Sequence, residues 1–180
     1  LQPIPPPEHP QQQVTMDFVT GLPAKDSCNA AFVIVDKLTK KSHFAAYKKS
    51  ISAEETASLF IATVVRLHGI PSAISSDRDT KFTSNFWCSL WDQFSTRPQF
   101  SSAYHFETGG HTEQANQTME QLIRATCNDM SDWKQQLPLI EFAYNNALSA
   151  TTRQSPFYLN YGQNSTVPIT PNIDDPPHNC

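Results

Sequence analysis

Residues 14–19 read VTMDFV, a run of strand-forming side chains with one carboxylate, Asp17, inside it. Two more stretches carry a carboxylate in a comparable place. IPSAISSD, residues 70–77, ends on Asp77, and GGHTEQANQTMEQLIRAT, residues 109–126, carries Glu113 near its start. Two aspartates on strand-like runs and a glutamate on a helix can together hold two divalent cations. Such a pair can clamp the attacking and leaving oxygens of a phosphodiester, so the pattern indicates polynucleotidyl transfer.

Each carboxylate also has an ordinary interpretation. Asp17 could face solvent on an alternating strand whose same face carries Thr15 and Val19, although an unpaired buried carboxylate would be costly. Asp77 follows a strand, where sites gather in α/β sheets, and its neighbour Asp79 fits a turn cap better. Asp36, which ends another strand-like run, is interpreted as a charge on the rim.

The helix expected over 112–128 has two faces. Its apolar face carries Ala115, Met119, Leu122, Ile123 and Thr126, and its polar face carries Glu113, Asn116, Gln117, Glu120 and Arg124. The polar face is either plainly solvated or turned toward a site. In the second case, Asn116 and Gln117 could bond phosphates or bases.

Composition sets further bounds. The length of 180 residues suits one domain, and the net charge of −4 does not by itself indicate nucleic-acid binding. Five lysines fall within residues 37–49, and Lys40 and Lys41 are among them. They form either a solvated surface or a patch that faces phosphates. The four cysteines lack metal-site spacing; Cys88 and Cys127 are expected to be buried thiols in a reducing compartment. We expect a soluble intracellular protein because neither a secretory signal nor a membrane-spanning run is visible.

The pattern of elements predicts an α/β fold. Strands are expected over 14–22, 30–38, 42–48, 72–76 and 99–101, and helices after Ser52, near 85–94 and beyond 112. Ser52 with Glu55 predicts a capping box, and Ser155 with Pro156 predicts the start of a last helix. Residues 1–13 and 163–180, rich in proline, are expected to be linkers in a longer polyprotein that flank a folded core over 14–162.

Several longer stretches go beyond this pattern and resemble the catalytic core of integrases from gypsy-like long-terminal-repeat retrotransposons. They are MDFVTGLP, VIVDKLTKKSHF, RLHGIPSAISSDRDTKFTSNFW, SSAYH, HTEQANQTMEQLIR, WKQQLPLIEFAYNNA and SPFYLNYG. The resemblance implies a ribonuclease H-like fold with a mixed five-stranded sheet flanked by helices. It places the catalytic, metal-binding carboxylates at Asp17, Asp77 and Glu113, and the 35 residues between the last two (113 − 77 − 1) agree with the family.

The resemblance also implies an activity. The cofactor would be Mg²⁺ or Mn²⁺, two per site when DNA is bound. The enzyme would trim the 3′ ends of the element's cDNA and join them to target DNA. Its partners would be double-stranded DNA and further copies of itself, in the nucleus or in a cytoplasmic particle before nuclear entry, with no membrane. Among residues that would touch DNA, we expect Asn116, Gln117, Lys40, Lys41 and His111.

The loop ahead of Glu113 departs from the family pattern. This chain has Glu107, His111 and Gln114 where the family has glutamine, glutamine and arginine. An added anion and a lost cation weaken phosphate binding. An alternative is therefore a catalytically inactive or co-opted module that binds nucleic acid or protein; a host nuclease or a cut-and-paste transposase of the same fold is a third possibility.

Overall fold

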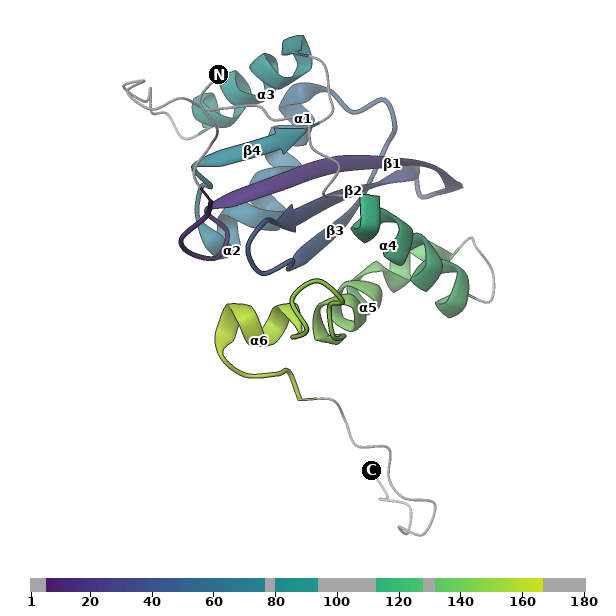
Figure 1. Cartoon of the computed structure of the whole chain (residues 1–180). Helices are drawn as coiled ribbons and strands as arrows, with labels where there is room; N and C mark the ends of the chain where they lie inside the picture. Colours follow the sequence, from purple (N-terminus) through teal and green to yellow (C-terminus); the bar gives the residue numbers. More distant parts are fainter. Residues whose placement is uncertain (1–5, 77–79, 94–112, 128–131, 167–180) are drawn as a thin grey trace, which may run out of the picture.

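The computed structural model describes residues 6–76, 80–93, 113–127 and 132–166, and Figure 1 shows a twisted sheet between two groups of helices. The strands are β1 (Gln13–Lys25), β2 (Cys28–Asp36), β3 (Ser42–Tyr47) and β4 (Ala73–Ser76). The helices are α1 (Ala53–Phe60), the π-helical segment η1 (Ile61–Val65), α2 (Arg66–His68), α3 (Thr80–Gln93), α4 (Glu113–Thr126), α5 (Trp133–Asn146) and α6 (Pro156–Tyr161).

The sheet is mixed, in the order β3-β2-β1-β4. β1, β2 and β3 form the antiparallel meander that the sequence predicted, and β4 adds to β1 in parallel. Four strands are therefore present in the described ranges. The fifth strand expected over 99–101 lies outside them, so that part of the prediction is not tested.

Alternating side chains build one apolar core on each face of the sheet. Met16 of β1 and Phe32 and Ile34 of β2 pack with Phe60 of α1 and Phe86 of α3. On the opposite face, the core contains Val33 and Val35 of β2, Met119 and Ile123 of α4, and Trp133 and Ile140 of α5. Figure 1 shows the same division, with α1 and α3 on one side and α4, α5 and α6 on the other. β2 is consequently buried on both faces.

The predicted helix signals are confirmed. Ser52 Oγ accepts from the Glu55 amide while the Glu55 side chain accepts from the Ser52 amide, which is a complete capping box. The helix ends at Gly69, whose φ of 83° suits a residue without Cβ. At α6, Ser155 caps the amide of Tyr158 and Pro156 is the first helical residue. Among the helices of the described ranges, none is long and apolar enough to cross a membrane.

Helix α5 covers the free edge of β3. Asn145 Oδ1 accepts from the Ser42 amide at 2.8 Å, and its Nδ2 donates to the Ser42 carbonyl, also at 2.8 Å. One turn earlier, Glu141 Oε2 accepts from the Phe44 amide at 2.8 Å. These side chains satisfy the outward-facing groups that an edge strand otherwise leaves unpaired.

Two interpretations from the sequence are wrong. Asp36 is fully buried, and its carboxylate accepts from the Gln11 amide and from both the amide and the hydroxyl of Thr39. It is thus the structural centre of the turn after β2, since three donors compensate for its burial. Cys88 is exposed on α3, whereas Cys127 is partly buried, because Cys88 lies on the face of α3 opposite Phe86 and Leu90.

Candidate active site

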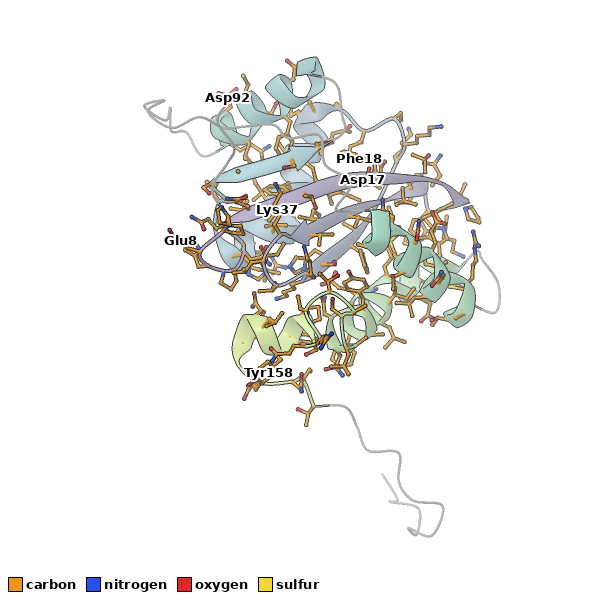
Figure 2. The ribbon with its side chains drawn as sticks, in the orientation of Figure 1. Glu8, Asp17, Phe18, Lys37, Asp92 and Tyr158 are labelled. Carbon is orange, nitrogen blue, oxygen red and sulfur yellow. The ribbon has the colours of Figure 1, made fainter. Side chains whose placement is uncertain are left out.

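Asp17 lies near the middle of β1, on the face of the sheet that α4 covers, and Figure 2 places it beside the first turn of α4. Its side chain is partly buried. Oδ1 accepts from the amide of Phe18 at 2.7 Å, and Oδ2 accepts from Nδ2 of Asn116. The side chain of Asp17 is therefore turned toward α4 and partly shielded from solvent.

Asn116 joins α4 to β1. Ala115, Met119 and Ile123 bury the apolar face of the helix, and this packing orients Asn116 toward the strand. Its Nδ2 donates to Asp17, but its Oδ1 is buried and has no hydrogen-bond partner in the part of the chain that is described. Buried acceptors without a donor are uncommon in folded proteins, and a bound ion or water can satisfy one.

The backbone brings the three segments of the proposed carboxylate set together. Met16, the residue before Asp17, pairs in parallel with Ser76, the last residue of β4. Asp77 follows Ser76 in sequence but lies outside the described residues. Glu113 is the first residue of α4, one helical turn before Asn116. Its side chain, too, is outside the part that can be described.

The oxygen atoms at this position fit a hard divalent cation. Mg²⁺ prefers carboxylate and other oxygen ligands, and Asp17 offers a carboxylate beside the unsatisfied oxygen of Asn116. No lysine or arginine forms an ion pair with Asp17 among the side chains placed in the structure. The carboxylate charge is thus left for another cation. No group of three or more metal-ligating side chains occurs within the same residues, since Asp77 and the Glu113 side chain are not among them.

The predicted DNA contacts lie in different settings. Gln117 is exposed on α4, and Lys40 is partly buried in the turn between β2 and β3. Lys41 is only 4% exposed, and its Nζ lies 2.5 Å from the hydroxyl of Tyr161. A DNA contact would require that ammonium to leave Tyr161. His111 lies outside the described residues, and contact with DNA remains a prediction for all of these side chains.

A second polar cluster was missed in the sequence. His43 Nδ1 lies 3.0 Å from Glu141 Oε1, and His43 Nε2 lies 2.9 Å from His68 Nε2. Burial, followed by the nearby charges of Lys41 and His43, lowers the pKa of His68 to about 4. The three residues are distant in sequence and share no spacing motif, so only the folded chain could reveal the cluster.

Comparison with solved structures defines the class of fold. The catalytic core domain of HTLV-2 integrase, in a trimeric form in complex with magnesium, matches 86% of this chain and 99% of its own, with a TM-score of 0.58 and 14% identity. Its dimeric form gives 0.59 at 15% identity, over 85% of this chain and 97% of that one. A chain of a simian T-cell lymphotropic virus intasome, in complex with a PP2A regulatory subunit, also has a TM-score of 0.59, at 16% identity. This match covers 97% of the present chain and 64% of the intasome chain. The fold is accordingly the mixed α/β, ribonuclease H-like fold of integrase catalytic cores.

Sequence comparison brings the chain closer to particular relatives. It is 39% identical, over 158 residues, to the Tf2-3 and Tf2-4 transposon polyproteins of Schizosaccharomyces pombe. The match covers 87% of this chain and 12% of each polyprotein. The chain is therefore homologous to one region of these retrotransposon polyproteins. No family model matches it.

Proposed function

We propose that this chain is the catalytic core of a gypsy-like retrotransposon integrase, which trims the 3′ ends of the element's cDNA and joins them to target DNA. The observation that carries the proposal is the contact between Asp17 and Asn116. It holds β1 against the helix that Glu113 begins, while the β1–β4 register brings the end of β4, just ahead of Asp77, beside Asp17. The homology to transposon polyproteins supports the same assignment.

In this proposal, Asp17, Asp77 and Glu113 hold Mg²⁺ or Mn²⁺. Bound cations supply Lewis-acid activation of the nucleophile and stabilise the charge that develops on the phosphate. The protein's own part is orientation. Asn116 fixes the carboxylate of Asp17 through Oδ2, and the Phe18 amide fixes Oδ1. A preorganised ligand needs no rearrangement when the reaction begins.

The proposal extends to partners and location. Double-stranded DNA would lie across the site, with Asn116, Gln117, Lys40, Lys41 and His111 as the candidate contacts. A homo-oligomer is required because two cDNA ends must join one target in concert. The reaction would take place in the nucleus.

The direct test is a disintegration assay. A branched DNA that mimics the strand-transfer product is incubated with the chain and Mn²⁺, beside Glu113→Gln as the matched inactive variant. We expect the parent chain to reseal the branch and the variant to fail. Equal resealing by both would contradict the role of Glu113.

The acidic net charge of −4 and Glu107 favour one other function, a module that keeps the fold and binds without turnover. Thermal melting with Mn²⁺ separates the two. A metal-dependent core is stabilised by Mn²⁺ through ligand linkage, and Asp77→Asn abolishes that stabilisation. Absence of both resealing and Mn²⁺ stabilisation would favour the binding module.

A further inference from the structure

A cavity of about 400 Å³ lies between α4, α5 and the segment that leads to α6. Ala115, Thr118 and Leu122 line it from α4, on a face of the helix different from the one that Asn116 turns toward Asp17. The volume is within the range of small-molecule sites in proteins. The cavity is therefore separate from the candidate active site, although the same helix forms a wall of both.

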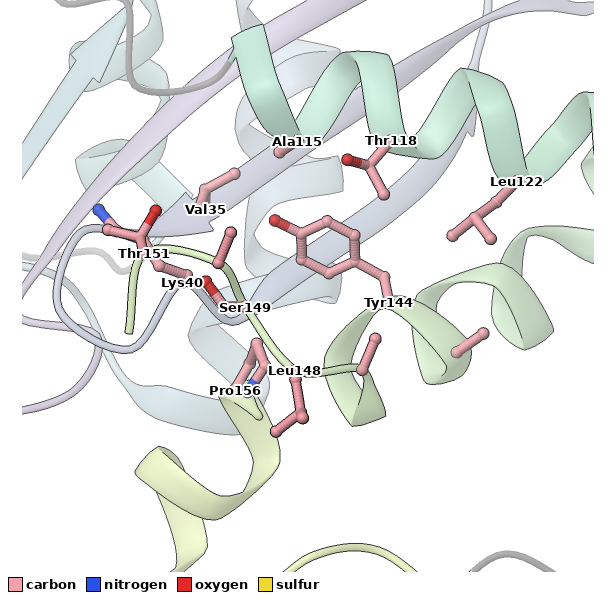
Figure 3. A pocket seen from close by; sticks show the side chains of 13 residues that line it. Val35, Lys40, Ala115, Thr118, Leu122, Tyr144, Leu148, Ser149, Thr151 and Pro156 are labelled. Carbon is pink, nitrogen blue, oxygen red and sulfur yellow. The ribbon is translucent and has the colours of Figure 1, made fainter. Parts of the chain in front are cut away.

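Small residues leave the space open, and larger apolar ones give it walls. Alanines at 115, 143, 147 and 150 line the cavity, together with Leu122, Leu148 and the ring of Tyr144. Leu148 is 79% exposed, the most exposed large apolar side chain in the described part. Apolar surface in contact with water is unfavourable, so a ligand that buries this side chain gains binding free energy. Figure 3 shows the Tyr144 ring facing the interior of this space.

The opposite end of the cavity is polar and positively charged. Figure 3 shows Lys40, Ser149 and Thr151 grouped there, well away from Leu122. Lys40 has a φ of 63°, and its amide donates to the Asp36 carbonyl at 3.0 Å, so its backbone is fixed in the turn. Its ammonium forms no ion pair with any carboxylate that the structure places. The cavity thus offers an uncompensated cation and two hydroxyl groups at one end.

We propose that this cavity binds a small aromatic anion, with its ring against Tyr144, Leu122 and Leu148 and its anionic group at Lys40, Ser149 and Thr151. Charge complementarity selects an anion, and the Tyr144 ring with the two leucine side chains favours an aromatic ring. The inference goes beyond integration and does not depend on it. Two kinds of ligand have this chemistry. One is a nucleotide, in which the sugar joins an aromatic base to a phosphate, and the other is a free aromatic acid.

The test uses 8-anilinonaphthalene-1-sulfonate, an aromatic sulfonate whose fluorescence rises in apolar surroundings. Ala147→Phe fills the cavity from its rim, and Lys40→Met removes the cation. We expect Ala147→Phe to abolish the fluorescence gain and Lys40→Met to weaken binding about tenfold, the effect of losing one charge-assisted hydrogen bond. Lys49→Met, an exposed lysine outside the cavity, is the matched control and should bind like the parent chain.

The same titration distinguishes the two kinds of ligand. Displacement of the probe by 2′-deoxyadenosine 5′-monophosphate supports a nucleotide, and displacement by 2-naphthoate alone supports a free aromatic acid. Melting curves of each variant establish that it folds. Probe binding that survives both Ala147→Phe and Lys40→Met would overturn the site. Loss of binding in Ala147→Phe without any change in Lys40→Met would overturn the anionic ligand.

Discussion

At the scale of single residues, the amide of Asn116 is the contact on which the candidate site depends. It donates to Asp17 and so decides how that carboxylate is presented. Groups that hold a metal ligand in place are typically worth about 10- to 100-fold in affinity or activity. Asn116 is consequently a positioning residue in the proposed reaction, in addition to its predicted place among the DNA contacts.

Asn116→Leu keeps the approximate size of the side chain and removes its donor. We expect resealing in the disintegration assay to fall about 10- to 100-fold, with a weaker Mn²⁺-induced rise in melting temperature. Gln121→Leu, an exposed position on the same helix, is the matched control. An unchanged Mn²⁺ response in Asn116→Leu would show that the contact does not orient the metal ligand.

Asp36 supports a second prediction. Asp36→Asn replaces an oxygen that accepts hydrogen bonds with an amide group that donates them, in a fully buried place already supplied with three donors. We expect a loss of about 2–3 kcal/mol in the free energy of unfolding, measured by urea denaturation. Asp26→Asn, whose carboxylate is exposed and pairs with Lys134 at 3.4 Å, should cost under about 0.5 kcal/mol. Similar losses in both variants would contradict a structural role for Asp36.

Some of this residue-scale detail follows from sequence and some does not. Asp17 could be selected because a carboxylate inside an apolar strand needs a reason. The burial of Asp36 could not be predicted from the sequence, because one of its donors is the amide of Gln11, 25 residues away in the chain. The same limit applies to His43, whose partners His68 and Glu141 come from two helices that sequence spacing does not connect.

At the scale of elements, His68 links α2 to β3 and, through His43, to Glu141 of α5. The lowered pKa of His68, about 4 against an ordinary 6.5, means that the unfolded chain binds this proton more readily than the folded one. The charged and titratable groups facing it are Lys41, His43 and Glu141. The contribution of neutral His68 to the free energy of unfolding is therefore fully present above pH 6.5. It is lost as the pH falls toward 4.

His68→Gln removes the titration while its amide can still donate to His43. We expect the urea midpoint of the parent chain to fall more between about pH 7 and about pH 4.5 than that of the variant. The difference between the parent chain and the variant in how the urea midpoint changes with pH gives the effect of His68 alone. Carboxylates that titrate in the same range affect both proteins equally. Parallel slopes would show that protonation of His68 is not coupled to folding.

At the scale of the whole molecule, the two apolar cores share one sheet. β2 contributes Phe32 and Ile34 to one core and Val33 and Val35 to the other. Neither core can come apart without exposing a face of this strand. The two layers of helices are accordingly expected to unfold together.

Ile123→Val on one face and Phe60→Leu on the other test this coupling. Each change removes buried volume, and Ile→Val typically costs about 0.5–1.5 kcal/mol. We expect both variants to melt at a lower temperature in a single transition, with coincident near- and far-ultraviolet circular dichroism. Two separate transitions in either variant would show that the cores are independent.

The overall architecture was largely predictable because its signals are local. Alternating strands, the Ser52–Glu55 capping box and the amphipathic face of α4 each lie within a few residues of sequence. The order of the strands is less local, yet the meander of β1 to β3 follows from short connections. The cavity behind α4 had no sequence signal, since its lining residues come from distant segments, with Val35 and Pro156 lying 121 positions apart in the chain (156 − 35 = 121).

The cover that α5 gives to β3 also sets a lower limit on how far this protein can be shortened. A fragment ending before Glu141 and Asn145 would still contain every described strand, but the amides of Ser42 and Phe44 would face outward on an open edge. Open strand edges recruit other strands, so such fragments would be prone to assemble into insoluble aggregates. A chain truncated at that point is thus expected in the insoluble fraction, whatever the state of its candidate site.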